Sequence, residues 1–237
     1  MNVQKKGYWS NHKYSRHSVE TDTKIAGWIG WKKFAKVIEE AERRGKLEKN
    51  LILTTFKLGG RIIEVLAAHR NMFSILEDDV SGETALIVEG LPLGKRWTKI
   101  GEYLDETGTK RFQTQKVEAF RTFGLTVSND REPYSQEFLE LVKSKSSLLF
   151  RSPYGNLERP YSRVRAYQII NGLSKKTGIY MYPHLLRAWR ASQLARDYGW
   201  KEGKLMEWFD WKDFETAHHY SKSGVFGLVS DMKKDRQ

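Results

Sequence analysis

The stretch Tyr182-Pro183-His184-Leu185-Leu186-Arg187 is followed by a run of alanine and other apolar residues. Pro183 favours the first position of a helix, so a helix is predicted to begin here. His184 and Arg187 are three positions apart and project from the same side of its first turn. An arginine that grips two oxygens beside a histidine that donates to a third suits a phosphate. A solvated basic turn with a capping histidine remains the alternative.

A second stretch follows near the C-terminus: Phe209-Asp210-Trp211-Lys212-Asp213-Phe214-Glu215-Thr216-Ala217-His218-His219-Tyr220-Ser221-Lys222. Its adjacent pair, His218 and His219, invites a metal-site interpretation. Neighbouring residues on a helix point about 100° apart, however, and chelate poorly. No carboxylate or further histidine completes a familiar ligand spacing, and the chain has no cysteine. The prediction is therefore that no metal binds.

A third stretch is Gly59-Gly60-Arg61-Ile62-Ile63-Glu64-Val65-Leu66. Paired glycines ahead of a helix put Arg61 on its first turn, where backbone N–H groups also favour an anion. An ordinary Gly-Gly turn with a surface arginine is the alternative.

Together these stretches resemble the tyrosine recombinase (phage integrase) family. That family has an arginine after a Gly-rich turn with an acidic residue three positions on, which here are Arg61 and Glu64. It then has His-x-x-Arg, matched by His184 and Arg187. The resemblance covers roughly residues 50 to 225.

The last family motif is a Gly-His or Gly-Trp pair ahead of the nucleophilic tyrosine. Trp211 precedes Tyr220 by nine positions, which is the family's spacing. Asp210 departs from the usual glycine and is expected to alter the turn before the last helix.

The family also uses a lysine from a β-hairpin between the first arginine and the histidine. Lys116, just ahead of the strand-like run Phe120-Arg121-Thr122-Phe123, is the preferred candidate, and Lys110 is the alternative. Either residue would also fit an ordinary surface lysine in a basic loop.

The resemblance implies a metal-free and cofactor-free DNA-breaking and rejoining reaction. Two arginines would hold the phosphodiester, a tryptophan would add a donor, a histidine would accept the tyrosine proton, and a lysine would protonate the departing 5′-hydroxyl. Tyrosine attack would give a 3′-phosphotyrosyl intermediate. The expected catalytic residues are Arg61, Lys116, His184, Arg187, Trp211 and Tyr220.

The expected partner is double-stranded DNA, with four protomers acting on two sites through a Holliday junction. No membrane and no small-molecule ligand is expected. A mobile-element integrase in the cytoplasm, associated with the nucleoid, is the implied setting. Two alternatives are a type IB topoisomerase-like enzyme and a DNA-binding regulator on the same fold.

The composition agrees with a polyanion partner. Among 237 residues, 41 Lys and Arg outnumber 29 Asp and Glu, giving a net charge of +12. Such a charge attracts nucleic acid. No RNA-binding signature is present, no apolar run is long enough to span a bilayer, and the absence of cysteine suits a reducing compartment.

The predicted fold class is α+β and mainly α-helical, a tyrosine-recombinase catalytic-domain fold with a small antiparallel β-sheet. The predicted domains are an N-terminal basic arm and helix over residues 1–50 and a catalytic domain with a C-terminal tail over residues 51–237. Periodicity predicts helices over 29–49, 60–70, 134–143, 161–175, 184–198, 201–209 and 214–220, and strands over 72–76, 85–88 and 119–127. The polar stretch 95–116 is too long for a tight hairpin and is expected to carry function or a small helix.

Two expectations concern the ends of the chain. Family members usually carry a separate DNA-clamping domain, and only about 50 residues precede the catalytic region. A minimal enzyme, a fragment of a longer chain and a clamp formed by the basic arm before Gly27 all stay open. The apolar segment 224–229 is predicted to dock on a neighbouring protomer, or else to cover its own domain.

Overall fold

The computed structural model describes residues 27–77, 79–80, 82–94, 97–127, 132–154 and 158–221, without the side chains of 97–100 and 116. The predicted basic arm, residues 1–25, and the apolar segment 224–229 lie outside the described residues.

Two consecutive helices begin the fold. The first, α2 (Trp31–Arg44), buries one stripe of apolar residues, and α3 (Lys46–Leu58) follows at once because Gly45 turns the chain. The predicted single helix over 29–49 was therefore wrong. The residues from Leu51 to Leu58 are all buried, so α3 shows no polar face and none of the periodicity that reveals a surface helix.

The helix predicted over 60–70 is also shorter than expected. It consists of α4 (Ile62–Leu66) and, after a break, the 3₁₀ turn η1 (Arg70–Met72).

The three predicted strands form one antiparallel sheet, in the order β1-β2-β5. Their bounds are β1 (Phe73–Glu77), β2 (Thr84–Pro92) and β5 (Phe120–Thr126). In β5 the buried residues alternate with exposed ones, as the period of a strand with one covered face requires.

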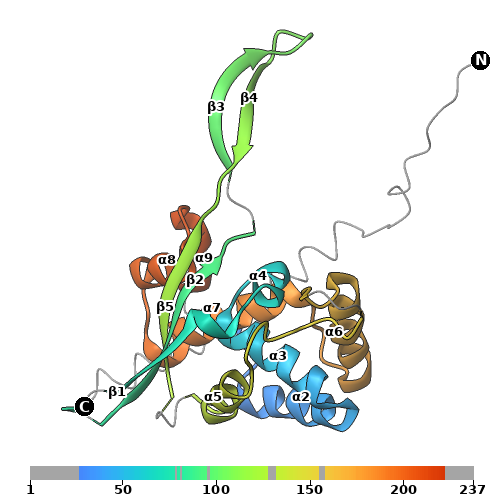
Figure 1. Ribbon diagram of the computed structural model, residues 1–237. Coiled ribbons are helices and arrows are strands. Elements are labelled where there is room, and N and C mark those ends of the chain that lie inside the picture. Colours follow the sequence, from blue (N-terminus) through green and yellow to red (C-terminus); the bar gives the residue numbers. More distant parts are fainter. Residues whose placement is uncertain are drawn as a thin grey trace, which may run out of the picture.

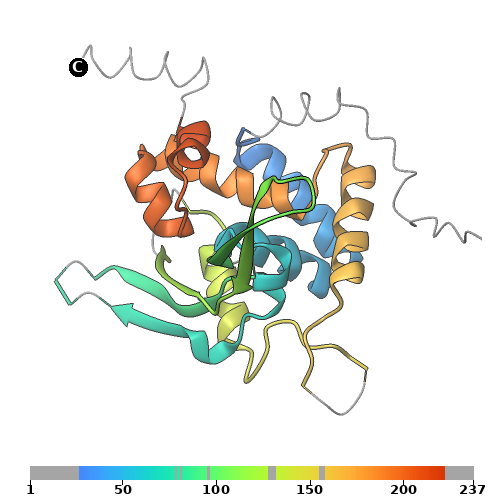
Figure 2. The ribbon, with the colours of Figure 1, turned by 90° about the horizontal axis from the view of Figure 1, so that it is seen from above.

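Residues 97–116 of the stretch 95–116 form a long hairpin, with no helix between its two strands. Strands β3 (Trp97–Leu104) and β4 (Lys110–Lys116) pair with each other and form a separate two-stranded sheet. The tip is closed by Asp105, whose carboxylate accepts hydrogen bonds from the backbone N–H groups of Thr107 and Thr109. The hairpin stands away from the rest of the molecule, while the β1–β2 turn extends sideways (Figures 1 and 2).

The remaining predicted helices are confirmed within a few residues of their expected ends. Glycines in the left-handed conformation end two of them, Gly178 after α6 and Gly199 after α7. Their bounds are α5 (Ser135–Lys143), α6 (Arg163–Thr177), α7 (Pro183–Tyr198), α8 (Glu202–Phe209) and α9 (Phe214–Ser221).

Helix α7 is the central element of this half of the chain. It is buried along most of its length and packs against α3, α8 and α9. Residues from all these helices and from the three-stranded sheet share one continuous hydrophobic core. The α+β, mainly helical fold class with a small antiparallel sheet is confirmed.

Candidate active site

Arg61 lies at the end of a tight turn between α3 and α4. Gly59 has φ 52°, and a Cβ atom there would lie 2.7 Å from the ring of Phe209 and 3.0 Å from that of Trp208. Only glycine allows this turn, since a side chain would be strained and would collide with aromatic rings. The turn therefore brings Arg61, at the N-terminus of α4, close to the end of α8.

Glu64 fixes the orientation of Arg61. Its side chain is fully buried, and its carboxylate accepts bonds from the Arg61 Nη1 and backbone N–H, both at 2.8 Å, and from the Gly94 N–H at 3.1 Å. Burial by itself raises the pKa of Glu64, but the Arg187 guanidinium and the bonds from Arg61 hold that pKa below its ordinary value. The carboxylate is thus an anion that aligns the neighbouring arginine.

Arg187 projects from the first half of α7 and is almost completely buried. Its Nη1 donates to the Gly59 carbonyl at 2.6 Å and its Nη2 to the Phe209 carbonyl at 3.4 Å. The Glu64 carboxylate lies 3.8 Å from Nη1. These contacts hold the guanidinium between the α3–α4 turn and the end of α8.

Asp210 adopts the conformation that a glycine would provide. It caps α8 with φ 51° and ψ 46°, in the left-handed region that aspartate tolerates better than most residues. Whether this turn differs from that of relatives with glycine at the position stays a prediction. Trp211 follows directly, and its backbone N–H bonds to the Met206 carbonyl at 2.9 Å.

Tyr220 stacks on Trp211. The two ring centroids are 5.3 Å apart at an interplanar angle of 22°, and Trp211 stacks in turn on Phe209 at 4.4 Å. Burial raises the pKa of the Tyr220 phenol above its ordinary value of 10, and the positive charge of Arg187 partly opposes this rise. Arg187 is thus near enough to favour the phenolate electrostatically.

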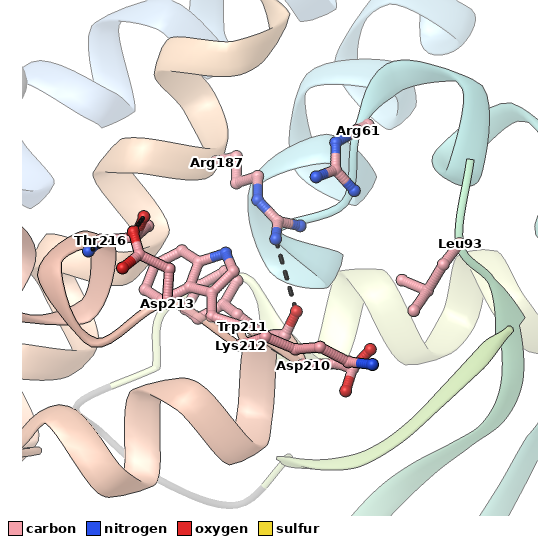
Figure 3. Close-up of a pocket in the computed structure, with 9 residues that line it drawn as sticks. Arg61, Leu93, Arg187, Asp210, Trp211, Lys212, Asp213 and Thr216 are labelled. Carbon is pink, nitrogen blue, oxygen red and sulfur yellow. Dashed lines mark hydrogen bonds between the residues drawn. The ribbon is translucent and has the colours of Figure 1, made fainter. Parts of the chain in front are cut away.

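Three of the predicted residues line one pocket (Figure 3). Arg61 and Arg187 point into it from one side, and the Trp211 indole borders it from the turn after α8. The full lining comprises Arg61, Leu93, Arg187, Phe209, Asp210, Trp211, Lys212, Asp213 and Thr216. The hollow next to the ring on which Tyr220 stacks thus holds three positive residues, Arg61, Arg187 and Lys212, together with the acidic residues Asp210 and Asp213.

The other three predicted residues, Tyr220, His184 and Lys116, are not part of this lining, and Tyr220 is next to it only through its stack on Trp211. His184 is exposed on the first turn of α7, one turn before Arg187. Lys116 is the last residue of β4, at the base of the hairpin. Three residues later, the carbonyl of Ala119 accepts a hydrogen bond from the backbone N–H of Leu93, which lines the pocket. Lys110 lies at the opposite end of β4, beside the tip, and pairs with Glu102.

Four buried charged residues were missed from the sequence. Arg121 lies in β5 on the same face as the buried Phe123, and that alternation could have revealed it. Lys57, Glu132 and Arg190 form a buried ion-pair network, with Glu132 2.7 Å from Lys57 and 2.6 Å from Arg190. No sequence signal connects these three residues, because they come from distant segments.

Buried positive side chains outnumber buried carboxylates among the described residues. The buried cations are Lys57, Arg121, Arg187 and Arg190, and the buried carboxylates are Glu64 and Glu132. Of these six side chains only Arg187 lines the pocket.

Among the described residues, no three His, Cys, Asp or Glu side chains are arranged to hold a metal ion. No helix in the described ranges has the length and apolar character needed to cross a bilayer.

The sequence matches no protein-family model and no curated protein. Solved structures do match. XerH site-specific recombinase bound to difH substrate, in a pre-cleavage complex, has a TM-score of 0.54 at 15% identity, covering 86% of this chain and 51% of that one. The fold is that of a tyrosine recombinase catalytic domain.

Two other recombinase structures agree. XerA recombinase matches with a TM-score of 0.53 at 17% identity over 89% of this chain and 64% of that one. The Tn1549 transposon integrase, in complex with a circular intermediate DNA, matches with a TM-score of 0.54 at 14% identity. The match covers 87% of this chain and 65% of that one. This chain therefore spans about half to two thirds of the length of the chains in these structures.

Proposed function

We propose that this chain is a site-specific tyrosine recombinase that cleaves and rejoins double-stranded DNA through a covalent bond to Tyr220. One observation carries the proposal. The guanidinium groups of Arg61 and Arg187 line a single pocket with Trp211, and the Tyr220 ring stacks on that tryptophan. The fold of the domain supports the same conclusion.

The arginines would neutralise the phosphodiester. A phosphodiester anion repels nucleophiles, and a pentacoordinate transition state carries additional charge on its oxygens. Arg61 and Arg187 would donate to the non-bridging oxygens, with the Trp211 indole N–H as a further donor. Because Glu64 and backbone carbonyls already orient both guanidiniums, little reorganisation is needed when the phosphate arrives.

Proton transfers would complete the reaction. The Tyr220 oxygen forms a bond to phosphorus, and the bond from phosphorus to the 5′ oxygen breaks. The phenol proton passes to His184, and Lys116 supplies a proton to the departing 5′-hydroxyl. The phosphotyrosyl bond conserves the energy of the phosphodiester, so that a 5′-hydroxyl can attack it later and rejoin the strands.

Assembly and setting belong to the same proposal. Four protomers would act on two DNA sites, exchanging strands through a Holliday junction, in the cytoplasm at the nucleoid. The division of the chain into residues 1–50 and 51–237 likewise remains a prediction.

The deciding experiment is covalent capture. The protein is incubated in EDTA with a pool of nicked DNA duplexes that carry a randomised segment, and adducts are separated on a denaturing gel. We expect an adduct with the wild type, none with Tyr220→Phe, and an undiminished adduct with Tyr154→Phe, which changes an exposed tyrosine in another part of the fold.

The outcomes separate the possible functions. Duplex binding without an adduct would contradict the enzymatic proposal and favour a DNA-binding regulator. An adduct that persists in Tyr220→Phe would assign the nucleophile elsewhere. Relaxation of a supercoiled plasmid at protein concentrations too low for assembly, without strand exchange between two captured sites, would indicate a topoisomerase instead.

A further inference from the structure

Two buried arginines join the ends of the same two helices. Arg121 donates from Nη2 to the Leu58 carbonyl at 2.6 Å and from Nη1 to the Trp208 carbonyl at 3.2 Å. Arg187 makes the equivalent bonds one residue further along each chain segment, to Gly59 and Phe209. The C-terminal ends of α3 and α8 are therefore linked by two parallel bridges.

This arrangement satisfies groups that helix ends leave unpaired. The last carbonyls of a helix have no partner within it, and they carry the negative end of the helix dipole. Two such ends facing each other would repel, and a planar guanidinium can donate to both of them at once. The bridges thus hold together two helix ends that come from opposite halves of the sequence.

Each helix end leads directly into the proposed site. After α3 the chain runs through Gly59 and Gly60 to Arg61, and after α8 it runs through Asp210 to Trp211. The distance between Arg61 and Trp211 therefore depends on the separation of the two helix ends. Arg187 borders the pocket and sets part of this separation, whereas Arg121 is not in the pocket lining.

The surroundings of Arg121 are unusual for a structural arginine. It is 2% exposed, both of its bonds from the terminal nitrogens go to carbonyl oxygens, and its Nε has no hydrogen-bond partner. Aromatic rings cover it instead, with the guanidinium carbon 4.3 Å from the Phe123 centroid and 5.1 Å from that of Trp208. Among the described residues no carboxylate forms an ion pair with Arg121, and Glu64 favours its charge only from a greater distance. A buried cation with so little pairing is costly.

The ring of Phe209 lies near both guanidiniums. Its centroid is 5.8 Å from the guanidinium carbon of Arg121 and 4.9 Å from that of Arg187. Phe209 also stacks on Trp211, which stacks on Tyr220. A change at Arg121 thus reaches the pocket through packed rings as well as through the two helix ends.

We propose that Arg121 is a positioning residue of the active site, which fixes Arg61, Arg187 and Trp211 relative to one another by bridging the ends of α3 and α8. The inference rests on the proposed function. In this role Arg121 touches neither substrate nor nucleophile. The affinity for DNA therefore does not depend on Arg121, whereas the rate of the chemical step does.

The test compares Arg121→Lys and Arg121→Met with Leu173→Ala. A lysine keeps the charge but cannot bridge two carbonyls in a plane, and a methionine keeps the volume but removes both bonds. Leu173 is fully buried in α6, so its loss destabilises the core without touching the site. For each variant we measure the melting temperature, the Kd for the captured duplex, and the single-turnover rate of adduct formation at a temperature where the protein is folded.

We expect both Arg121 variants to bind the duplex within about twofold of the wild type and to form adduct about 10 to 100 times more slowly, as misplaced catalytic groups do. Leu173→Ala should melt earlier and react at the wild-type rate. If Arg121→Met does not fold, Arg121→Lys alone decides.

The inference would be overturned if folded Arg121→Lys formed adduct as fast as Leu173→Ala. It would also be overturned if Arg121→Lys could not fold, because the residue would then serve stability alone. A wild type that forms no adduct would instead overturn the proposed function, and this inference with it.

Discussion

Glu64 is the buried carboxylate that balances the charge of the arginines in the proposed site. Its buried carboxylate accepts two hydrogen bonds from Arg61 and one from Gly94, and lies close to Arg187. A buried carboxylate surrounded by donors stabilises the folded state only while it is ionised.

Glu64→Gln should therefore lower the free energy of unfolding at neutral pH by about 3 kcal/mol, the usual consequence of breaking a buried ion pair. The folded-state pKa of Glu64 is lowered, so its stabilisation is complete above the ordinary value of 4.5 and is lost as the pH falls below it. Urea unfolding at several pH values measures both effects. The variant should lose less stability in acid than the wild type does.

The matched control is Glu207→Gln, on the exposed face of α8. Its stability should follow the wild-type pH curve within about 0.5 kcal/mol, as is usual for surface changes. Equal curves for Glu64→Gln and the wild type would show that the carboxylate is not needed in ionised form.

The hairpin β3–β4 determines which lysine can act as the general acid. Lys116 ends β4 beside the body of the domain, whereas Lys110 begins the strand near the tip, about 20 Å further out at the usual rise of a strand. A group at the tip would need the hairpin to fold back before it reached the pocket. The geometry of the β3–β4 hairpin thus favours Lys116 over Lys110 as the proposed general acid.

Lys116→Ala should slow adduct formation by roughly 10² to 10³-fold, the usual contribution of a general acid. Lys110→Ala should leave the rate unchanged, because it removes only an exposed ion pair with Glu102. A substrate with sulfur in place of the bridging 5′ oxygen needs no proton on leaving, and it should restore the rate of Lys116→Ala. The reverse order of effects would identify Lys110 as the acid.

Periodicity predicted elements with one polar face, such as β5 and α5, whose buried positions recur at the period of a strand and of a helix. Helix α7 is buried along most of its length, and it was predicted from Pro183 at its start and Gly199 after its end. In contrast, α3 is buried on all sides, and β3 and β4 expose both faces over most of their described length, so neither segment carries the expected pattern.

The same distinction applies to the site. Arg61, Arg187, Trp211 and Tyr220 were found because each belongs to a local motif of fixed spacing. Arg121 was missed although its place on the buried face of β5 could be read from the alternation of the strand, while its partner Trp208, 87 positions away, could not. Glu132 was missed because its partners come from distant segments. Only the packed fold brings such residues together.

At the scale of the whole molecule, charge sets the behaviour with DNA. The chain carries a net charge of +12. Binding of such a protein to duplex DNA releases condensed counterions, and its affinity therefore falls as salt is added.

Between 50 and 200 mM salt the Kd for duplex DNA should rise about 10³-fold or more. Fluorescence anisotropy with a labelled duplex measures this, and a series at fixed salt with an added neutral osmolyte controls for water activity. A Kd that does not change with salt would mean that phosphate contacts contribute little to binding.

The paired arginine bridges have a consequence for how the folded chain opens. Since Arg121 and Arg187 attach the end of α8 to the end of α3, the C-terminal helices cannot detach without breaking bonds to the N-terminal half. Amide hydrogens near both helix ends should then exchange with deuterium through one shared opening, with the same protection factor. Segments 150 residues apart in sequence would behave as a single cooperative unit.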